Sequence, residues 1–208
     1  MWYPATVIEP PDGTDPLTLE QVKRQCGIAQ SNTEQDDTLD LLMKAARGYV
    51  ERYCSIYVPT QTVVVKCDAF CDFSRVPVVP LQSIASITYV DAAGDDATLA
   101  SGAYELRNDE MTVSIVPSPG ARWPTPLPGS RIALRAVVGF EDVPAEIISA
   151  MLLHVRSQYG MTGADASLKK KVDDGVGSRE WDMTGTVDRF ARQAIASFLV
   201  PFRCWPIA

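Results

Sequence analysis

The chain contains a single histidine, His154, among its 208 residues. A histidine-activated nucleophile needs an aligned serine or cysteine and an orienting carboxylate as well. No serine lies in a G-x-S-x-G context or a comparable one. We therefore predict no catalytic residues and no enzymatic activity, and we expect His154 to lie at the edge of a core or in a protein interface.

The sequence lacks an arrangement of cysteines that suits a metal ion. A tetrahedral zinc site draws four ligands, usually from closely spaced pairs, and only Cys67 and Cys71 are close in sequence. The number of cysteines is odd and their spacing is irregular, so we expect free thiols, most of them buried as small apolar groups. We predict no metal and no other cofactor. The five residues are Cys26, Cys54, Cys67, Cys71 and Cys204.

The chain also lacks an excess of positive charge and a long apolar run. Its formal net charge of -7 disfavours binding to nucleic acid by phosphate neutralisation, although an acidic protein can still surround DNA without gripping it. No apolar run reaches the roughly 18 residues that a membrane helix needs. The first residues lack the basic start and apolar core of a signal peptide, so we expect a protein that folds in a cytoplasm and meets no membrane.

Helical periodicity is strong in four segments. Thr18 and Gln21 form a capping-box pattern at the start of a helix over 17–27, which Gly27 ends. A long helix over 37–57 and a last helix over 186–200 each carry one apolar stripe. Val143 and Pro144 open the helix over 143–159, and we expect this helix to be central and to pack against the helices over 37–57 and 186–200. Its stripe is Ile147, Ile148, Met151, Leu152, Val155 and Tyr159.

Between the first two and the last two helices, the apolar period changes to that of strands. We predict five or six short antiparallel strands, over 62–67, 83–91, about 104–106, 111–115 and 131–138. The proline-rich stretch 117–129 does not suit a sheet interior, and we interpret it as an ordered excursion pinned by Trp123.

The predicted fold class is α+β: a helical bundle of three to four helices with an inserted small antiparallel β-module. Residues 1–58 supply an N-terminal arm and the first helices of the bundle. Residues 59–139 are the β-insertion. Residues 140–208 supply the central helix, a mobile loop over 161–185, the C-terminal helix and a tail.

Large apolar side chains in polar or terminal segments are candidate contact residues. Trp181, Phe202 and Trp205 either anchor an interface or cap the chain's own bundle. In the N-terminal arm, Trp2, Tyr3, Val7 and Ile8 either cover the chain's own core or meet another subunit. The lysines Lys169, Lys170 and Lys171 are flanked by aspartates, so they suit a solvated loop or a contact with an acidic protein surface better than DNA.

Five blocks in this order resemble the head–tail connector, or adaptor, proteins of long-tailed bacteriophages and gene-transfer particles. They are LTLEQVKRQCGI, DDTLDLLMKAARGYVERYC, PLQSIASITYVDAAG, VPAEIISAMLLHVRSQYG and FLVPFR. The resemblance implies a structural virion protein of the neck, made in the host cytoplasm. It also implies a homo-oligomeric ring, expected to hold twelve copies, that extends the DNA channel between the portal protein and a downstream stopper or tail protein.

The resemblance places a portal contact in residues 198–208. With the aromatic residues above, it gives the portal or subunit interface candidates Trp181, Phe198, Pro201, Phe202, Arg203 and Trp205. One alternative is another neck component, either a stopper or a tail-completion protein. A further alternative is a small cytoplasmic enzyme with a deep pocket in the β-module, for which Asp68, Asp72, Arg75 and Arg107 are the available polar groups.

Overall fold

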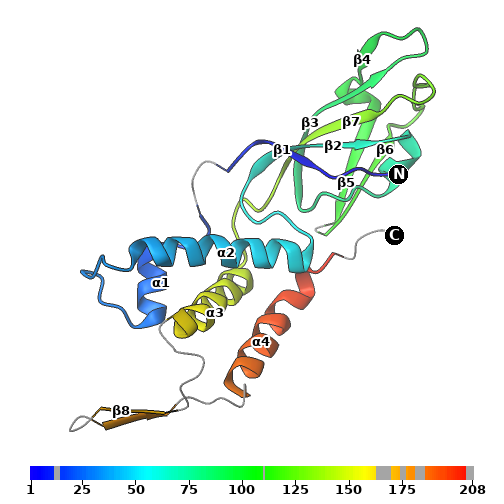
Figure 1. Cartoon of the computed structure of the whole chain (residues 1–208). Helices are drawn as coiled ribbons and strands as arrows, with labels where there is room; N and C mark the ends of the chain where they lie inside the picture. Colours follow the sequence, from blue (N-terminus) through cyan, green and yellow to red (C-terminus); the bar gives the residue numbers. More distant parts are fainter. Residues whose placement is uncertain (12–14, 110, 163–169, 174–176, 181–185, 205–208) are drawn as a thin grey trace. The chain divides into compact units, whose positions relative to one another are not determined.

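The computed structural model describes residues 1–11, 15–109, 111–162, 170–173, 177–180 and 186–204 (Figure 1). Its elements fall into two compact units. The β unit comprises Met1–Thr14, Glu51–Val143 and Phe202–Ala208, and the helical unit comprises Asp15–Val50 and Pro144–Pro201.

The β unit holds a five-stranded antiparallel sheet in the order β1-β2-β7-β3-β4 (Figure 1). A separate antiparallel pair joins β5 to β6. The strands are β1 Thr6–Glu9, β2 Gln61–Cys67, β3 Leu81–Val90, β4 Asp96–Thr98, β5 Tyr104–Asp109, β6 Thr112–Pro117 and β7 Ile132–Val138. The five predicted strand segments are all present. The sequence interpretation missed β1, which it took as an extended arm, and the short β4.

The core of this unit follows from the period-two pattern of β2 and β7. Val63, Val65 and Cys67 face Ala136, Leu134 and Ile132 across the ladder, and all six side chains are buried. Residues that alternate along a strand lie on one face of the sheet, so the register aligns the apolar face of one strand with that of its neighbour. Arg135 lies between these positions and pairs with Glu9 of β1 at 2.5 Å.

An aromatic cluster closes one part of the β unit. Trp123 stacks on Phe70 at 5.0 Å between ring centroids and meets Phe73 edge-on at 5.7 Å. Trp2 stacks on Phe73 at 5.6 Å, and its indole N–H donates to the carbonyl of Arg75 at 2.8 Å. The prediction that Trp123 pins the proline-rich excursion is therefore confirmed, and Trp2 covers the core of its own chain.

Gly139 makes the close turn after β7. Its φ of 106° lies in the region that favours glycine, and a Cβ at this position would overlap the backbone of Pro59. Its N–H donates to the carbonyl of Pro80 at 2.9 Å, and the next N–H, of Phe140, donates to the carbonyl of Val58 at 3.1 Å. The backbone therefore approaches too closely here for any other residue.

The helical unit contains α1 Leu19–Cys26, most of α2 Asp36–Cys54, α3 Ala145–Thr162 and α4 Thr186–Leu199. The α1 capping box is present as predicted, with the Gln21 N–H donating to the Thr18 hydroxyl at 3.2 Å. The α3 helix packs against α1 and α4 (Figure 1). It meets α2 where His154 stacks on Tyr49 at 4.4 Å between centroids. Its buried residues are Ile147, Ala150, Met151 and Val155.

Two helix boundaries and one segment differ from the predictions. The helix predicted to reach residue 57 ends at Cys54, because Ser55 adopts a left-handed φ of 57° and the Ile56 N–H returns to the Glu51 carbonyl at 3.1 Å. This is the Schellman type of helix end, which usually uses glycine. The α3 helix continues through Gly160 to Thr162, since Gly160 stays helical. The segment predicted as a loop contains the hairpin strands β8 Lys170–Asp173 and β9 Gly177–Glu180.

The predicted α+β class is confirmed, with four helices and antiparallel sheets in the part of the chain described here. The boundaries at residues 58 and 139 stay a prediction, as does the assignment of the helices to one bundle.

Candidate interaction surfaces

Four of the predicted contact residues lie within the described part of the C-terminal segment. Phe198 and Pro201 are exposed residues of the helical unit, and the half-buried Phe202 and exposed Arg203 belong to the β unit. Phe202 meets Phe140 edge-on at 6.3 Å, and the Arg203 guanidinium lies 5.3 Å from the centre of the Tyr53 ring. Phe202 and Arg203 therefore already have partners within the β unit.

The next residue fixes this segment to the end of α2. The N–H of Cys204 donates to the carbonyl of Cys54 at 2.8 Å. That carbonyl is one of the last in the helix, where a helix leaves its acceptors without intrahelical donors. The segment 202–204 thus completes the C-terminal end of α2.

The other predicted contact residues cannot be placed in the same way. Trp181, Trp205 and Lys169 lie outside the described residues. Lys170 and Lys171 belong to β8, where they pair in register with Glu180 and Arg179 of β9.

The α4 helix carries two apolar faces rather than the one stripe predicted. Ile195 and Leu199 are buried, whereas Phe190 is 62% exposed and Phe198 is 36% exposed. Residues 190, 194 and 198 are spaced by four, which places them along one side of a helix. The exposed side, Phe190–Ala194–Phe198, is called the α4 face below.

Sequence reasoning missed Leu41, which is 67% exposed on α2. The buried side of that helix consists of Leu39, Met43, Ala46 and Val50. Leu41 follows Leu39 by two residues, about 200° around the helix, and so points away from that side. The signal in the sequence was a large apolar residue outside the stripe.

Some side chains of the N-terminal arm cover the chain's own core, whereas others are exposed and could contact another subunit. Trp2 joins the aromatic cluster, and Tyr3 lies beneath the Arg131 guanidinium, which is 3.8 Å from its ring centre. Val7 and Ile8, in the edge strand β1, are about half exposed. The first pair therefore covers the chain's own fold, and the second remains a candidate subunit contact.

The buried thiols are poor nucleophiles. Burial raises the pKa of Cys54 to about 11 and that of Cys67 to about 12. Since the thiolate is the reactive form, both residues stay protonated near neutral pH. Burial also lowers the pKa of His154 from its ordinary value, in keeping with its stacking on Tyr49.

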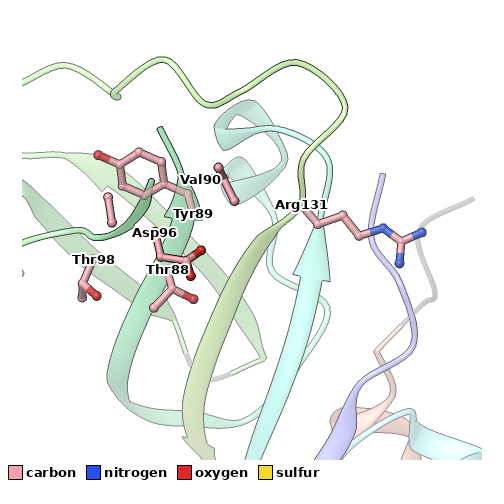
Figure 2. Close-up of a pocket in the computed structure, with 7 residues that line it drawn as sticks. Thr88, Tyr89, Val90, Asp96, Thr98 and Arg131 are labelled. Atoms are coloured by element: carbon pink, nitrogen blue, oxygen red, sulfur yellow. The ribbon is translucent and has the colours of Figure 1, made fainter. Parts of the chain in front are cut away.

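A shallow hollow of about 300 Å³ lies on the β unit beside β3 and β4 (Figure 2). Figure 2 shows the side chain of Arg131 directed away from Thr88 and Asp96, in agreement with its position over Tyr3. The hollow is lined by Thr88, Tyr89, Val90, Asp96, Ala97, Thr98 and Arg131.

The polar residues considered for an enzyme site do not line this hollow. Asp68 accepts a hydrogen bond from the Tyr3 hydroxyl at 2.9 Å, and Asp72 accepts one from the Met1 amine at 2.6 Å. Arg75 contributes its carbonyl to the Trp2 indole, and Arg107 pairs with Ser114 in the β5–β6 ladder. Asp68, Asp72 and Arg75 therefore hold the N-terminal arm.

Within the described ranges, no three His, Cys, Asp or Glu residues gather closely enough to hold a metal ion. None of the helices in these ranges is both long enough and apolar enough to cross a membrane.

Residues 16–112 match the sequence model of a family described as phage gp6-like head-tail connector protein. The matched range runs from just before α1 to the start of β6. This match confirms the resemblance seen in the sequence and the predicted class of structural connector. A search of curated proteins finds no significant match.

The fold is similar to those of chains in solved gene transfer agent (GTA) particles. One is described as the neck of an empty GTA particle computed with C6 symmetry: the TM-score is 0.69 at 16% identity, over 99% of this chain and 98% of the other. A chain from the virion of a native particle gives 0.68 at 16% identity, over 98% and 97%. A chain from the neck of a native particle computed with C12 symmetry gives 0.66 at 16% identity, over 99% and 98%.

Proposed function

We propose that the chain is a structural subunit of the neck of a phage-like particle, where several copies form a ring between the portal protein and the tail-side components. The observation that carries this proposal is the connector-family match over residues 16–112. The likeness along nearly the full chain to proteins in necks of six-fold and twelve-fold computed symmetry supports a ring. A ring of twelve copies is the expectation.

The part of the proposal that concerns DNA follows from charge. The chain has 26 acidic residues and 19 basic ones, so a channel built from many copies carries a large negative charge. Such a channel repels phosphates, and DNA passes without sequence-specific binding. The role needs no catalysis, no cofactor and no membrane, and the protein reaches the neck after synthesis in the host cytoplasm.

The proposal assigns different tasks to parts of the chain. The helices act as a rigid bundle that carries contact surfaces, and residues 198–208 together with Trp181 contribute to contacts with the portal or with neighbouring subunits. Lys169, Lys170 and Lys171 meet an acidic protein surface. A downstream stopper or tail protein docks on the opposite side of the ring.

Electron microscopy of the purified chain mixed with portal rings tests this function. The expected result is a defined complex in which additional density with the symmetry of the portal extends its channel. Portal rings that remain bare at every ratio of the two proteins contradict the proposal. A chain of similar size and charge from outside the connector family serves as the control for non-specific adhesion.

A further inference from the structure

The α4 face leaves Phe190 mostly exposed, at 62%, and Phe198 partly exposed, at 36%. Ile195 and Leu199 bury the adjacent side of the helix, so the mostly exposed Phe190 contributes little to holding α4 in place. Exposed aromatic residues in a row are unusual on a surface that meets only water and are common as anchors of protein interfaces. Arg189, also exposed, directly precedes Phe190 and lies about 100° from it around the helix, so its long side chain adds positive charge at the edge of the α4 face.

A second exposed surface of the same unit has the opposite charge. Leu41 projects from the outer side of α2, with Asp37 one turn before it and Ala45 one turn after it, both exposed. This outer side, Asp37–Leu41–Ala45, is called the α2 face below. Because Ala45 is small, a large side chain of another molecule can lie next to Leu41. The nearby Lys44 is held by Asp40 at 2.6 Å, so its charge is balanced locally.

The two faces differ in the size of their side chains and in the charge beside them. The α4 face offers large aromatic rings beside Arg189, and the α2 face offers Leu41 and a small residue beside Asp37. A parallel two-fold contact between two α4 faces would bring two copies of Arg189 together, which like-charge repulsion disfavours. A contact between different faces is head-to-tail, and such contacts generate closed rings when the rotation between copies closes.

We propose that the α4 face of one copy packs on the α2 face of the next copy, with Phe190 beside Leu41 and Arg189 facing Asp37. This contact deepens the proposed function, on which it rests, because it names a second copy of this chain as the occupant of the α4 face. Each copy then contributes one face of each kind, and no other protein is needed to cover Phe190 and Phe198.

Site-directed cross-linking of the full chain tests the contact and preserves the apolar anchors. Gln193 is exposed one turn after Phe190, and Ala45 is exposed one turn after Leu41. We replace the exposed Cys71 and the half-buried Cys26 and Cys204 by serine, introduce Q193C and A45C together, and treat the concentrated protein with a short bifunctional maleimide. The expected product is a ladder of dimers, trimers and larger oligomers, whereas Q193C alone and A45C alone give at most dimers.

Charge reversal provides the matched control. R189D alone and D37R alone should each lower the yield of the ladder by about fivefold, the scale of one exposed ion pair, and the two reversals in one chain should restore it. A double-cysteine variant that yields no more product than the single-cysteine variants overturns the proposal. A ladder that is insensitive to both reversals overturns it as well.

Binding to portal rings separates this inference from the proposed function. If α4 docks on the portal instead, F190A weakens portal binding and no ladder forms between copies, which overturns the contact but leaves the connector role standing. A ladder from a chain that forms no complex with portal rings supports the contact and contradicts the connector role.

Discussion

The six phenylalanines differ in exposure between the two units. In the β unit, Phe70 and Phe73 are buried, and the half-buried Phe140 and Phe202 contact each other. In the helical unit, Phe190 and Phe198 are both exposed. Aromatic side chains are the largest single contributors of apolar surface. The β unit therefore uses them to hold itself together, whereas the helical unit leaves them available to another molecule.

The largest expected effect on stability is the loss of a buried aromatic ring in the β unit, compared with the loss of an exposed ring in the helical unit. F73A should lower the free energy of unfolding by about 3–5 kcal/mol, because Phe73 is fully buried against Trp2, Phe70 and Trp123. F190A should change it by less than about 0.5 kcal/mol, since the side chain is mostly in solvent. Urea unfolding followed by tryptophan fluorescence and by circular dichroism measures both, and equal losses in the two variants would remove the distinction between the units.

The helical unit depends on a buried ion pair where the β unit uses aromatic rings. Lys23 on α1 has a side chain only 4% exposed, and its ammonium lies 2.6 Å from Asp36 at the start of α2. D36N leaves the ammonium buried without its counter-charge and should cost about 3 kcal/mol, the lower end for buried pairs because Asp36 is 27% exposed.

The α2 helix also contains an exposed ion pair, which serves as the control for D36N. Asp40 pairs with Lys44 at the same distance of 2.6 Å, but both side chains are more than half exposed. D40N should therefore cost about 0.5 kcal/mol or less. Calorimetric unfolding of the two variants compares them directly, and similar losses would show that the burial of Lys23 does not matter.

Substitutions at the C-terminal ends of α1 and α2 should change the stability by smaller amounts and in opposite directions. S55G should stabilise the chain by about 0.5–1 kcal/mol, because Ser55 holds a left-handed φ of 57° that costs little for glycine. G27A at the end of α1, where φ is 72° and no atom lies near the added methyl, should destabilise by about 1 kcal/mol. Thermal melts of both variants measure the effects, and a loss of stability in S55G would contradict the assigned conformation.

The smallest expected effect is a pH dependence in the helical unit. Burial lowers the pKa of His154 in the folded chain, so the folded state favours the neutral imidazole. The unfolded chain binds a proton below about pH 6.5, and the stability contributed by neutral His154 is therefore present above that pH and is lost as the pH falls towards the lowered folded pKa. H154Q should flatten the stability profile between pH 7 and pH 5, and an unchanged profile would contradict this role.

Local signals in the sequence predicted most of the elements. Thr18 with Gln21 identified α1, and alternating apolar residues identified β2 and β7. The end of α2 was misplaced because Ser55 adopts a conformation that side-chain type alone does not favour, and only the return of Ile56 to Glu51 reveals it. The strands β1 and β4 were missed because pairing with β2 and β3, and not their own pattern, makes them strands.

The candidate surfaces were less predictable than the elements. Periodicity identified the apolar residues of α4 but could not tell which side α3 covers, so Phe190 and Ile195 were assigned to one stripe although only Ile195 is buried. Leu41 escaped attention because a single apolar residue outside a stripe has no periodic signal. The sequence left open whether Phe202 anchors an interface or caps the chain's own bundle, and the structure shows a contact with Phe140 of the β unit that sequence separation concealed. Its contact with a portal or a neighbouring subunit stays a prediction.

Symmetric cryo-electron microscopy of the assembled neck tests most directly whether the helical unit is the part that meets other copies. We expect a ring in which the α4 face of each copy is covered by the α2 face of its neighbour, so that Phe190 and Phe198 are buried. A ring in which the β units alone make the contacts between copies, with Phe190 and Phe198 still in solvent, would contradict it.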